Sequence, residues 1–386
     1  MNYDVIIAGA GPAGAQCARY LAKNSKYSVL LLDKTQEIGE PKKSTAGTKK
    51  AILKQFELPK KIVQSDIDRV VFESPNEESV FSVDACVLDF GLLKKFLAED
   101  AVHNGAVLQI QSSVTAPIVE NKKVVGVQYD DFEGSHEARA KIVIDATGPS
   151  AFIASKLGLR KLDPASHWIG MEYEMENLDL KRQKSMVIKF DNNYAPGGYS
   201  WVFSTGKNHG KVGNCWGVDK FKKNGGSGSQ VSYLKKWIRD DERLVHGEAM
   251  EVHAGDAYLN YQKQIVSNGF MCAGDSVCAI EPIFGEGIRW GLYSGMFAAQ
   301  TAIGALKTND FSSRQLSVLG EKWDSLKMSR RLACAVNRAF YRLPNSGFDS
   351  FVANTRKLDA AALERFMDCA FTLRDILKLM PIPGFK

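Results

Sequence analysis

The sequence predicts an α/β fold in which a domain with a parallel sheet is interrupted by an antiparallel sheet and followed by a helical region. A short apolar run, Val5 to Ile7, leads into a glycine-rich turn, a helical stretch and a second apolar run ending at Asp33. This strand–helix–strand order indicates a parallel sheet. Long alternating stretches between 167 and 256 are typical of antiparallel strands with one solvated face. Residues 311–386 have a largely helical pattern.

The glycine-rich turn has the spacing of a dinucleotide-binding fingerprint, G-x-G-x-x-G. Gly9 allows the tight turn, Gly11 lets the backbone approach a pyrophosphate, and Gly14 lets the helix pack on the strand. The helix N-terminus offers N–H groups and a positive dipole end to phosphates. The alternative is an ordinary glycine-rich turn, but the flanking strands and helix favour a Rossmann-like nucleotide-binding domain.

A carboxylate at the end of the second strand completes this unit. Asp33 lies about twenty residues beyond the fingerprint, where an acid binds ribose hydroxyls. The predicted cofactor-binding residues of the first unit are Gly9, Gly11, Pro12, Ala13, Gly14, Asp33 and Lys34.

Two later motifs indicate which dinucleotide binds. A strand predicted from Glu137 to Ile144 ends in an Ala-Thr-Gly turn, and another from Ile265 ends in Gly274-Asp275. A second glycine turn, Pro282 to Ile288, then opens a helix of small residues. Together with the fingerprint, these motifs resemble FAD enzymes of the hydroxybenzoate-hydroxylase type.

The resemblance implies that the cofactor is FAD. It places Asp275 at the ribityl or phosphate region and the second glycine turn beside the N1/O2 edge of the isoalloxazine. A helix N-terminus at that edge stabilises the anionic reduced flavin. The further residues expected at the cofactor are Val114, Ala146, Thr147, Gly148, Gly274, Asp275, Pro282, Gly285, Gly287 and Ile288.

A basic and polar loop follows Asp33 and is predicted to return over the cofactor. Its candidate contacts are Lys43, Ser44 and Thr45, with a solvated surface loop as the alternative. Relatives carry an arginine just before the helix expected at 92–103. Phe90 occupies that position here, so a nearby lysine is expected to replace the arginine.

The remaining elements complete a three-part organisation. A helix is expected from Thr48 to Phe56, and four strands between 107 and 144 read as a meander. We predict a discontinuous FAD-binding domain, an antiparallel-sheet substrate domain and a C-terminal helical region. In that order their residues are 1–66 with 86–160 and 262–310, then 67–85 with 161–261, then 311–386.

A Tyr-x-Trp-x-Phe alternation marks the candidate catalytic strand. Tyr199, Trp201 and Phe203 share one face of a strand, and an aromatic core stripe is the alternative. With the second glycine turn and the Ala-Thr-Gly turn, this motif resembles the geranylgeranyl reductase family. Two departures are Ser204, where the family has proline, and Lys42 to Thr45, where some relatives have a cysteine.

This resemblance implies an FAD enzyme that saturates isoprenoid double bonds of archaeal membrane lipids or of the chlorophyll side chain. Reduced flavin delivers hydride from N5 to one alkene carbon, and a proton goes to the other carbon. The aromatic residues are expected to exclude water and pack isoprene units. Because the chain has only one fingerprint, NAD(P)H or a ferredoxin is expected to reduce FAD transiently.

Other functions of the same fold stay open at this point. A flavin monooxygenase or epoxidase would bind oxygen near 282–287, and a halogenase would need a lysine between flavin and substrate. A carotenoid cyclase would use Glu281 or Glu286 to protonate a polyene without net redox change. A flavin-binding sensor is a fourth class, although no output domain is evident in this sequence.

The composition restricts the expected cellular compartment and the expected partners of the protein. The 386 residues are 45% hydrophobic and 24% charged, with a net charge of +6 and seven scattered cysteines. These values predict a cytoplasmic protein with reduced thiols, no metal site and no nucleic-acid partner. No membrane span or signal peptide is evident. The net positive charge and the apolar C-terminal helices favour peripheral contact with a membrane. An isoprenoid or prenylated lipid substrate would be taken up through this contact.

Overall fold

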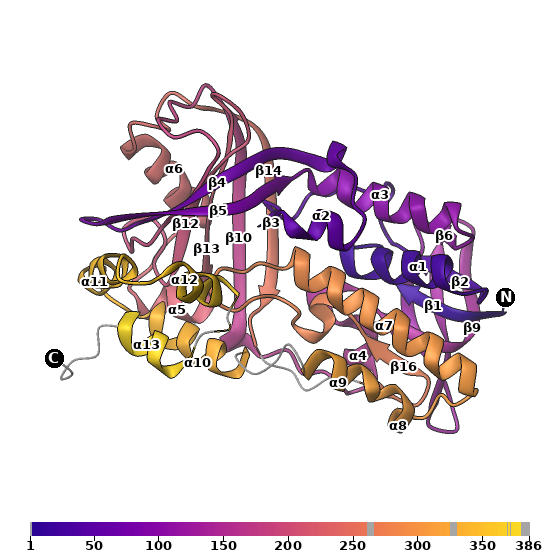
Figure 1. Ribbon diagram of the computed structural model, residues 1–386. Coiled ribbons are helices and arrows are strands. Elements are labelled where there is room, and N and C mark those ends of the chain that lie inside the picture. The colour runs from indigo at the N-terminus through magenta and orange to yellow at the C-terminus, as the bar shows by residue number, and fades with distance from the viewer. Residues whose placement is uncertain (1, 261–265, 325–329, 369, 371, 380–386) are drawn as a thin grey trace.

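The chain folds into two sheets that lie next to each other, with C-terminal helices packed against the second sheet (Figure 1). The computed structural model describes residues 2–260, 266–324, 330–368, 370 and 372–379. The N-terminus lies at the far end of the first sheet and the C-terminal helices lie at the opposite end of the molecule. The predicted α/β fold class is confirmed.

The first sheet has a parallel centre that begins with the fingerprint strand. β1 (Asn2–Ala8) pairs in parallel with β2 (Val29–Leu32) on one side and β9 (Gly134–Asp145) on the other. Val5, Ile6 and Ile7 are fully buried, as expected for a strand with both faces covered. The other strands are β6 (Val107–Gln109), β7 (Ser113–Glu120), β8 (Lys123–Asp131), β15 (Val266–Ser267) and β16 (Phe270–Cys272).

The predicted four-stranded meander is wrong for its first strand. β6 pairs in parallel with β2 and extends the nucleotide-binding sheet. Only β7, β8 and β9 form antiparallel neighbours. The sequence pattern of a three-residue strand is too short to predict which strand it pairs with, because parallel and antiparallel strands of that length have the same pattern.

Helices cover the first sheet and bring the fingerprint close to the late glycine motifs. α1 (Pro12–Asn24) packs along α7 (Ile288–Thr308), with α3 (Phe90–His103) beside it. The approach requires a glycine, since a Cβ on Gly295 would lie 2.1 Å from the Ala13 carbonyl oxygen. α7 extends beyond the small-residue helix predicted from Arg289 to Ala302, because Ala305 and Leu306 continue its buried face.

The second sheet is antiparallel except where β11 meets β4. α6 (Gln230–Asp240) covers one of its faces through Leu234 and Trp237, which pack with Val202 and Val212. The strand order is β14 (Glu248–Tyr258), β10 (His167–Glu176), β13 (Gly210–Gly217), β12 (Gly198–Ser204), β11 (Ser185–Lys189), β4 (Val63–Glu73), β5 (Glu78–Leu88) and β3 (Gly47–Lys49).

Two details of this sheet differ from the sequence prediction. The helix expected from Thr48 to Phe56 is only α2 (Ala51–Gln55), because β3 pairs with β5 before it. That strand lies within the segment predicted as the FAD-binding domain. β14 was not recognised as a strand, because it is an edge strand whose exposed positions, such as Met250 and Val252, blur the alternation.

The C-terminal region is helical, as predicted, over the residues that the structure describes. Phe340, Phe348 and Phe351 are fully buried against Phe190 of the second sheet. Its helices are α8 (Ser313–Leu316), α9 (Val318–Asp324), α10 (Arg330–Phe340), α11 (Asn345–Thr355), α12 (Ala360–Met367) and α13 (Leu373–Leu379). Short elements elsewhere are α4 (Phe152–Lys156), α5 (Val218–Lys223) and 3-10 turns at Lys60–Ile62, Gly148–Ser150, Pro164–Ser166 and Gly274–Val277.

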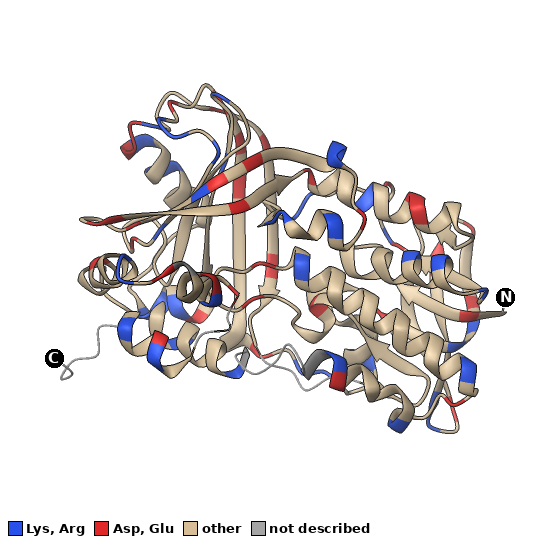
Figure 2. Ribbon diagram, in the orientation of Figure 1, with Lys and Arg blue, Asp and Glu red and all other residues tan. Residues whose placement is uncertain are grey.

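The charged residues, the helices and the cysteines can each be compared with what the composition predicts. Lysine, arginine and acidic residues are interspersed over both halves of the molecule (Figure 2). Among the described residues, no helix combines the length and apolarity needed to cross a bilayer. Among the described residues, Cys17, Cys86, Cys215 and Cys272 are free thiols.

Candidate active site

The fingerprint turn uses its three glycines in three different ways. Gly9 has φ +104°, and a Cβ there would lie 2.3 Å from the Ala146 carbonyl oxygen. A Cβ on Gly14 would lie 1.9 Å from the Gly9 carbonyl oxygen. A Cβ on Gly11 would meet no described atom within 4 Å. The chain itself therefore needs glycine at 9 and 14, whereas Gly11 borders open space of the kind a phosphate group fills.

The N-terminus of α1 is open to an anion. Gly11 is its N-cap and supplies no side-chain hydrogen bond, and Pro12 occupies the first turn. Uncapped N–H groups and the helix dipole at this point fit a pyrophosphate. Asp33 accepts a hydrogen bond from the Ala10 N–H at 2.6 Å, so its carboxylate lies against the turn. Lys34 is exposed beside it.

The Ala-Thr-Gly and Gly-Asp motifs meet the fingerprint. The fully buried Asp145 carboxylate accepts from the Thr147 N–H at 3.0 Å and from the Ser276 hydroxyl at 3.1 Å. The Gly274 N–H donates to Ser294 of α7, and a Cβ on Gly274 would lie 2.7 Å from the Cβ of Ala13. The structure thus brings the turn at 146–148 and the turn at 274–275 together at the start of α1.

Val114 lies apart from these turns on β7. It is half-buried and pairs with Tyr129 of β8, at the edge of the cluster that covers Ile6 and Leu32. Its predicted contact with the cofactor stays a prediction.

The second glycine turn is held by the neighbouring Glu281 and by two residues of the C-terminal region. The Glu281 carboxylate accepts from the Ile283 and Phe284 N–H groups, each at 2.5 Å. Asn337 donates to the Pro282 carbonyl at 2.6 Å, and Tyr341 donates to the Ile283 carbonyl at 2.6 Å. These contacts fix the turn between the start of α7 and the C-terminal helices.

The start of α7 forms a second uncapped helix N-terminus. Gly287 is its N-cap and offers no side-chain hydrogen bond, and Ile288 begins the helix. Gly285 is exposed with φ +72°. This arrangement fits the anionic edge of a reduced flavin, as the family resemblance implies.

An ionic network surrounds that helix start. Glu286 accepts from the Thr48 hydroxyl and from Arg289, both at 2.7 Å. Arg289 also donates to Asp368 at 2.8 Å, and Lys49 donates to Asp368 at 2.8 Å. Burial opposes the charge on Arg289, but its two carboxylate partners raise the pKa of its guanidinium. The network links β3, α7 and the end of α12.

The aromatic wall, which we define as Tyr199, Trp201 and Phe203, lies on β12 and faces the C-terminal helices. Tyr199 is 9% exposed, Trp201 is 8% exposed and Phe203 is half-buried. Tyr199 donates to the Phe284 carbonyl, so the wall touches the second glycine turn. Burial raises the pKa of Tyr199 well above its ordinary value, so its hydroxyl stays protonated.

The loop with Lys43, Ser44 and Thr45 lies across the second sheet. The Thr45 hydroxyl donates to Glu172 of β10, and Lys211 of β13 donates to the Thr45 carbonyl at 3.3 Å. Lys43 is exposed, whereas Ser44 accepts from the Ala46 N–H at 3.1 Å. These contacts hold the loop against β10 and β13 of the second sheet. Its predicted return over the cofactor stays a prediction.

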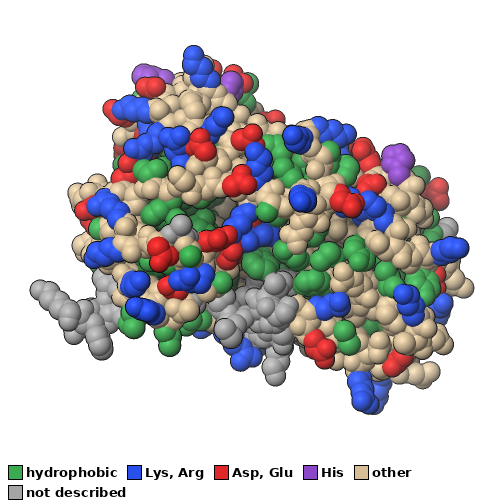
Figure 3. All heavy atoms as spheres, viewed as in Figure 1, with side chains coloured by type: hydrophobic (Ala, Val, Ile, Leu, Met, Phe, Trp, Pro, Cys, Tyr) green, Lys and Arg blue, Asp and Glu red, His purple; other side chains and the backbone are tan. Residues whose placement is uncertain are grey.

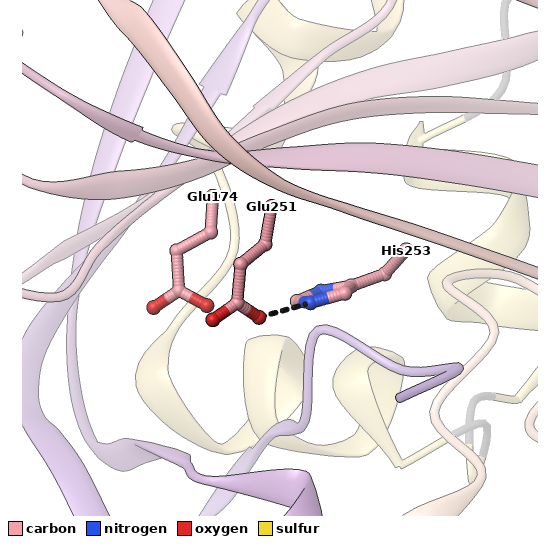
Figure 4. Close-up of side chains that lie close together, drawn as sticks. All are labelled: Glu174, Glu251 and His253. Atoms are coloured by element: carbon pink, nitrogen blue, oxygen red, sulfur yellow. Dashed lines mark hydrogen bonds and ion pairs between the residues drawn. The ribbon is translucent and has the colours of Figure 1, made fainter. Parts of the chain in front are cut away.

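Sequence reasoning missed a polar cluster next to the wall. Glu172 and Glu174 on β10 and Glu251 and His253 on β14 lie on the same face of two neighbouring strands. Figure 4 shows Glu174, Glu251 and His253 pointing to the same side. Glu172 is 2% exposed and His253 is 6% exposed. The alternation of β10 puts Glu172 on the same face as Glu174, but no motif marks His253, because β14 itself was not recognised.

Lys94 is a second residue that was not identified. It lies on α3, is 8% exposed, and its Nζ is 3.4 Å from the Glu40 carbonyl oxygen. Burial lowers the pKa of Lys94, and the negative charge of Asp33 opposes that shift. A lysine was expected to replace the missing arginine, and Lys94 is a buried lysine on the helix that starts at Phe90.

Figure 3 shows a hollow where the two halves of the molecule meet, with hydrophobic and charged side chains on its rim. Two open helix N-termini, the space at Gly11 and the acid at Asp33 fit a dinucleotide cofactor that extends from the first sheet toward this junction.

Comparisons with known sequences agree with this geometry. The model of the FAD dependent oxidoreductase family matches residues 4–157, and the model of the geranylgeranyl reductase catalytic domain matches 167–257. A digeranylgeranylglycerophospholipid reductase of Haloferax volcanii is 37% identical, with 94% of this chain and 92% of the relative covered. Digeranylgeranylglycerophospholipid reductase 3 of Methanosphaera stadtmanae is 29% identical, with 99% and 97% covered.

Solved structures share the fold. A geranylgeranyl bacteriochlorophyll reductase-like protein from Thermoplasma acidophilum superposes with a TM-score of 0.87 at 24% identity, covering 98% of this chain and 95% of that chain. A flavin-dependent brominase, Bmp2, superposes with a TM-score of 0.74 at 20% identity, covering 100% and 96%. The structural matches identify the fold, and the sequence matches identify the family. The chain belongs to the geranylgeranyl reductase family of FAD-dependent oxidoreductases.

Proposed function

We propose that this protein reduces the carbon–carbon double bonds of geranylgeranyl chains on a glycerophospholipid. The observation that carries the proposal is the contact between the aromatic wall and the second glycine turn, made by the Tyr199 hydroxyl and the Phe284 carbonyl. It brings an apolar surface suited to isoprene units next to a helix N-terminus suited to reduced flavin. The names of the relatives point to the same substrate class.

Bound FAD would supply the hydride for each double bond. The chain's own residues would bind and orient it. Gly11 and the first turn of α1 would receive the pyrophosphate, Asp33 the ribose, and Gly287 with the start of α7 the flavin edge. Asp275, Thr147 and the loop at 43–45 would close the site around the cofactor.

Lys94 would add a positive charge to this site. The negative charge of Asp33 and the positive charge of Lys43 both act on its ammonium. In this position it would take the place of the arginine that relatives carry before the same helix. A buried ammonium near a cofactor phosphate or ribose gains a partner that offsets its desolvation.

The lipid would reach the wall from the membrane surface. The exposed side of α13 carries Leu373 and Leu377, which are 68% and 57% exposed, together with Arg374 and Lys378. Apolar and basic side chains on one helix face suit an anionic lipid surface. The electron donor would be NAD(P)H or a ferredoxin acting transiently on the bound flavin.

The test is anaerobic reoxidation of the reduced holoenzyme. The flavin is reduced with dithionite, and vesicles of a digeranylgeranyl phospholipid are added without oxygen. We expect the flavin to reoxidise while the lipid gains two hydrogens per double bond, measured by mass spectrometry. Reoxidation only with oxygen would indicate a monooxygenase, a requirement for halide would indicate a halogenase, and isomerised lipid with flavin still reduced would indicate a cyclase.

A further inference from the structure

A row of four residues crosses the second sheet from the aromatic wall to its edge. Trp201 of β12 lies opposite Gly213 of β13, Gly213 lies opposite Glu172 of β10, and Glu172 lies opposite His253 of β14. Gly213 has no side chain, and a Cβ there would lie 2.3 Å from the Trp201 ring. The gap lets the indole pass over β13, and its Nε1 donates to Glu172 Oε2 at 3.1 Å.

Hydrogen bonds continue from Glu172 to the surface. The His253 ring lies between two carboxylates, with Nδ1 3.0 Å from Glu172 Oε1 and Nε2 2.9 Å from Glu251 Oε2. Glu251 is 50% exposed and also accepts from Lys42 at 2.7 Å. An unbroken chain of polar atoms thus joins a solvent-exposed carboxylate to the buried wall. Figure 4 shows its outer end, at Glu251 and His253.

We propose that Glu251, His253 and Glu172 form a proton-delivery chain that supplies the second hydrogen of each saturated double bond. This inference rests on the proposed function, in which reduced FAD provides the hydride. The proton passes from His253 Nδ1 to Glu172 Oε1. The O–H bond of Glu172 then breaks as the new C–H bond forms, the electron pair stays on the carboxylate, and His253 regains a proton at the surface through Glu251.

The other acids on this face are poorly suited to the task. Tyr199 and Cys215 sit in the next row, and burial raises the pKa of Cys215 to about 12 and that of Tyr199 well above its ordinary value. Both groups release a proton too reluctantly near neutral pH. His253 begins from an ordinary value near neutrality, and its hydrogen bond to Glu172 raises its pKa.

The charged groups around His253 favour binding of a proton by its imidazole over binding of a metal ion by the cluster. Glu174, Glu251 and His253 could together ligate a cation, since their ligand atoms lie within 4.8 Å of one another. The ammonium of Lys42, however, already occupies Glu251 Oε2, and the buried Lys211 adds a second positive charge that opposes ionisation of His253. Two ammonium groups beside the cluster repel a metal ion, while Glu172 and Glu251 stabilise an imidazolium.

The experiment compares Glu172→Gln and His253→Gln with Glu174→Gln in the FAD-loaded protein. Glu174 is the control, because it lies on the same strand and face, opposite Glu251, and accepts a hydrogen bond from Gln64 rather than from a member of the chain. With dithionite-reduced protein and digeranylgeranyl phospholipid vesicles, we expect Glu172→Gln to slow single-turnover reoxidation about 100-fold, the lower range for loss of a general acid. His253→Gln should slow it less and abolish the dependence of the rate on pH near neutrality, and Glu174→Gln should match wild type.

A second readout does not depend on turnover. Histidine-labelled protein with oxidised FAD is titrated by NMR, and Glu172→Gln should lower the pKa of His253 whereas Glu174→Gln should leave it close to the wild-type value. Wild-type reoxidation should also slow in deuterium oxide, and this isotope effect remains measurable if Glu172→Gln fails to fold.

The outcomes separate the two proposals. If wild type reoxidises with lipid, but the three variants share its rate and pH profile, the chain serves only to hold the loop at 42–45 and the inference is overturned. Loss of the wild-type rate on treatment with EDTA would overturn it in favour of a metal site. If wild type does not reoxidise with any isoprenoid lipid, the proposed function fails, and the inference fails with it.

Discussion

In the fingerprint, two glycines are required by the packing of the chain itself, and the third is explained by the approach of a ligand. Gly9 and Gly14 are needed for packing, because any side chain there would collide with backbone atoms. Gly11 has ordinary backbone angles, φ −65° and ψ 176°, and described protein atoms leave the space beside it open. Its only evident reason to be glycine is close approach by a cofactor.

Replacing Gly11 with valine should therefore yield folded, colourless protein. The new side chain fits the apoprotein but fills the space proposed for the pyrophosphate. The measurement pairs flavin absorbance of the purified protein with thermal unfolding of the apoprotein. Gly14→Val is the contrasting variant, and it should destabilise the fold itself, since its Cβ would lie 1.9 Å from a carbonyl oxygen. A yellow Gly11→Val protein would contradict the assignment.

Trp201 has both a packing role and a polar contact, and two substitutions separate them. Trp201→Ala removes a side chain that is only 8% exposed and should cost about 3–5 kcal/mol of unfolding free energy. Trp201→Phe keeps most of the ring but loses the donor to Glu172 and should cost roughly 1–3 kcal/mol. Chemical denaturation measures both, and equal losses would show that the hydrogen bond dominates the stability of this site.

His253 makes stability depend on pH. Its hydrogen bond to Glu172 raises its pKa in the folded state above the unfolded value, so folding favours the protonated ring. Its contribution is fully present below the unfolded pKa, about 6.5, and is lost as pH rises through the folded pKa. Wild type should thus unfold at a higher temperature than His253→Gln in acid, and the difference should shrink in alkali. A difference that grows with pH would contradict this sign.

At the scale of elements, strands with strong patterns were predictable and a weakly patterned edge strand was not. β1 and β2 are buried on both faces and read as apolar runs, and β12 alternates aromatic residues. β14 shows neither pattern, because its first five residues are all exposed. The polar cluster was missed for this reason: a row across β12, β13, β10 and β14 exists only through strand register, which sequence periodicity does not reveal.

The start of α7 depends on a helix that is distant in sequence. Arg289 is 10% exposed and bridges Glu286 and Asp368, which joins α7 to the end of α12. Asp368→Asn should weaken this link by about 1–3 kcal/mol, because it removes the charge of one partner of a buried guanidinium. Hydrogen exchange should then rise in α12 before it rises in α1. Glu364→Gln is the control, since Glu364 is 69% exposed and pairs with Lys49 at 3.2 Å. Equal effects of the two variants would contradict the link.

At the scale of the whole molecule, the site is built where two sheets and the C-terminal helices meet. The sequence predicts the cofactor motifs because each is local: a turn, a strand end, a helix start. The walls of the site come from residues far apart in the chain, such as Thr45 with Glu172, or Tyr199 with Phe284. Such pairs follow from tertiary packing, which is why the aromatic motif was visible in the sequence and its partners were not.

The outer surface of this assembly leads to a prediction about membranes. On α13, Asp375 points inward, where it is 4% exposed and pairs with Arg365 at 2.9 Å. The outward side is left to Leu373, Arg374, Leu377 and Lys378. Figure 2 shows further basic residues among the neighbouring C-terminal helices. An apolar pair flanked by positive charge should bind anionic vesicles at low salt and release them as salt screens the attraction.

Replacing both Leu373 and Leu377 with serine should reduce binding to anionic vesicles at least about tenfold, because two partly inserted leucines contribute one or more kcal/mol each. Vesicle flotation measures the bound fraction, and flavin content checks that the site is intact. The control replaces Met250 and Val252, which are both 62% exposed on the edge strand β14, at a distance from α13 along the chain. If the α13 variant still floats like wild type while the β14 variant does not, the membrane contact lies on the edge of the second sheet, next to the outer end of the proposed proton chain at Glu251.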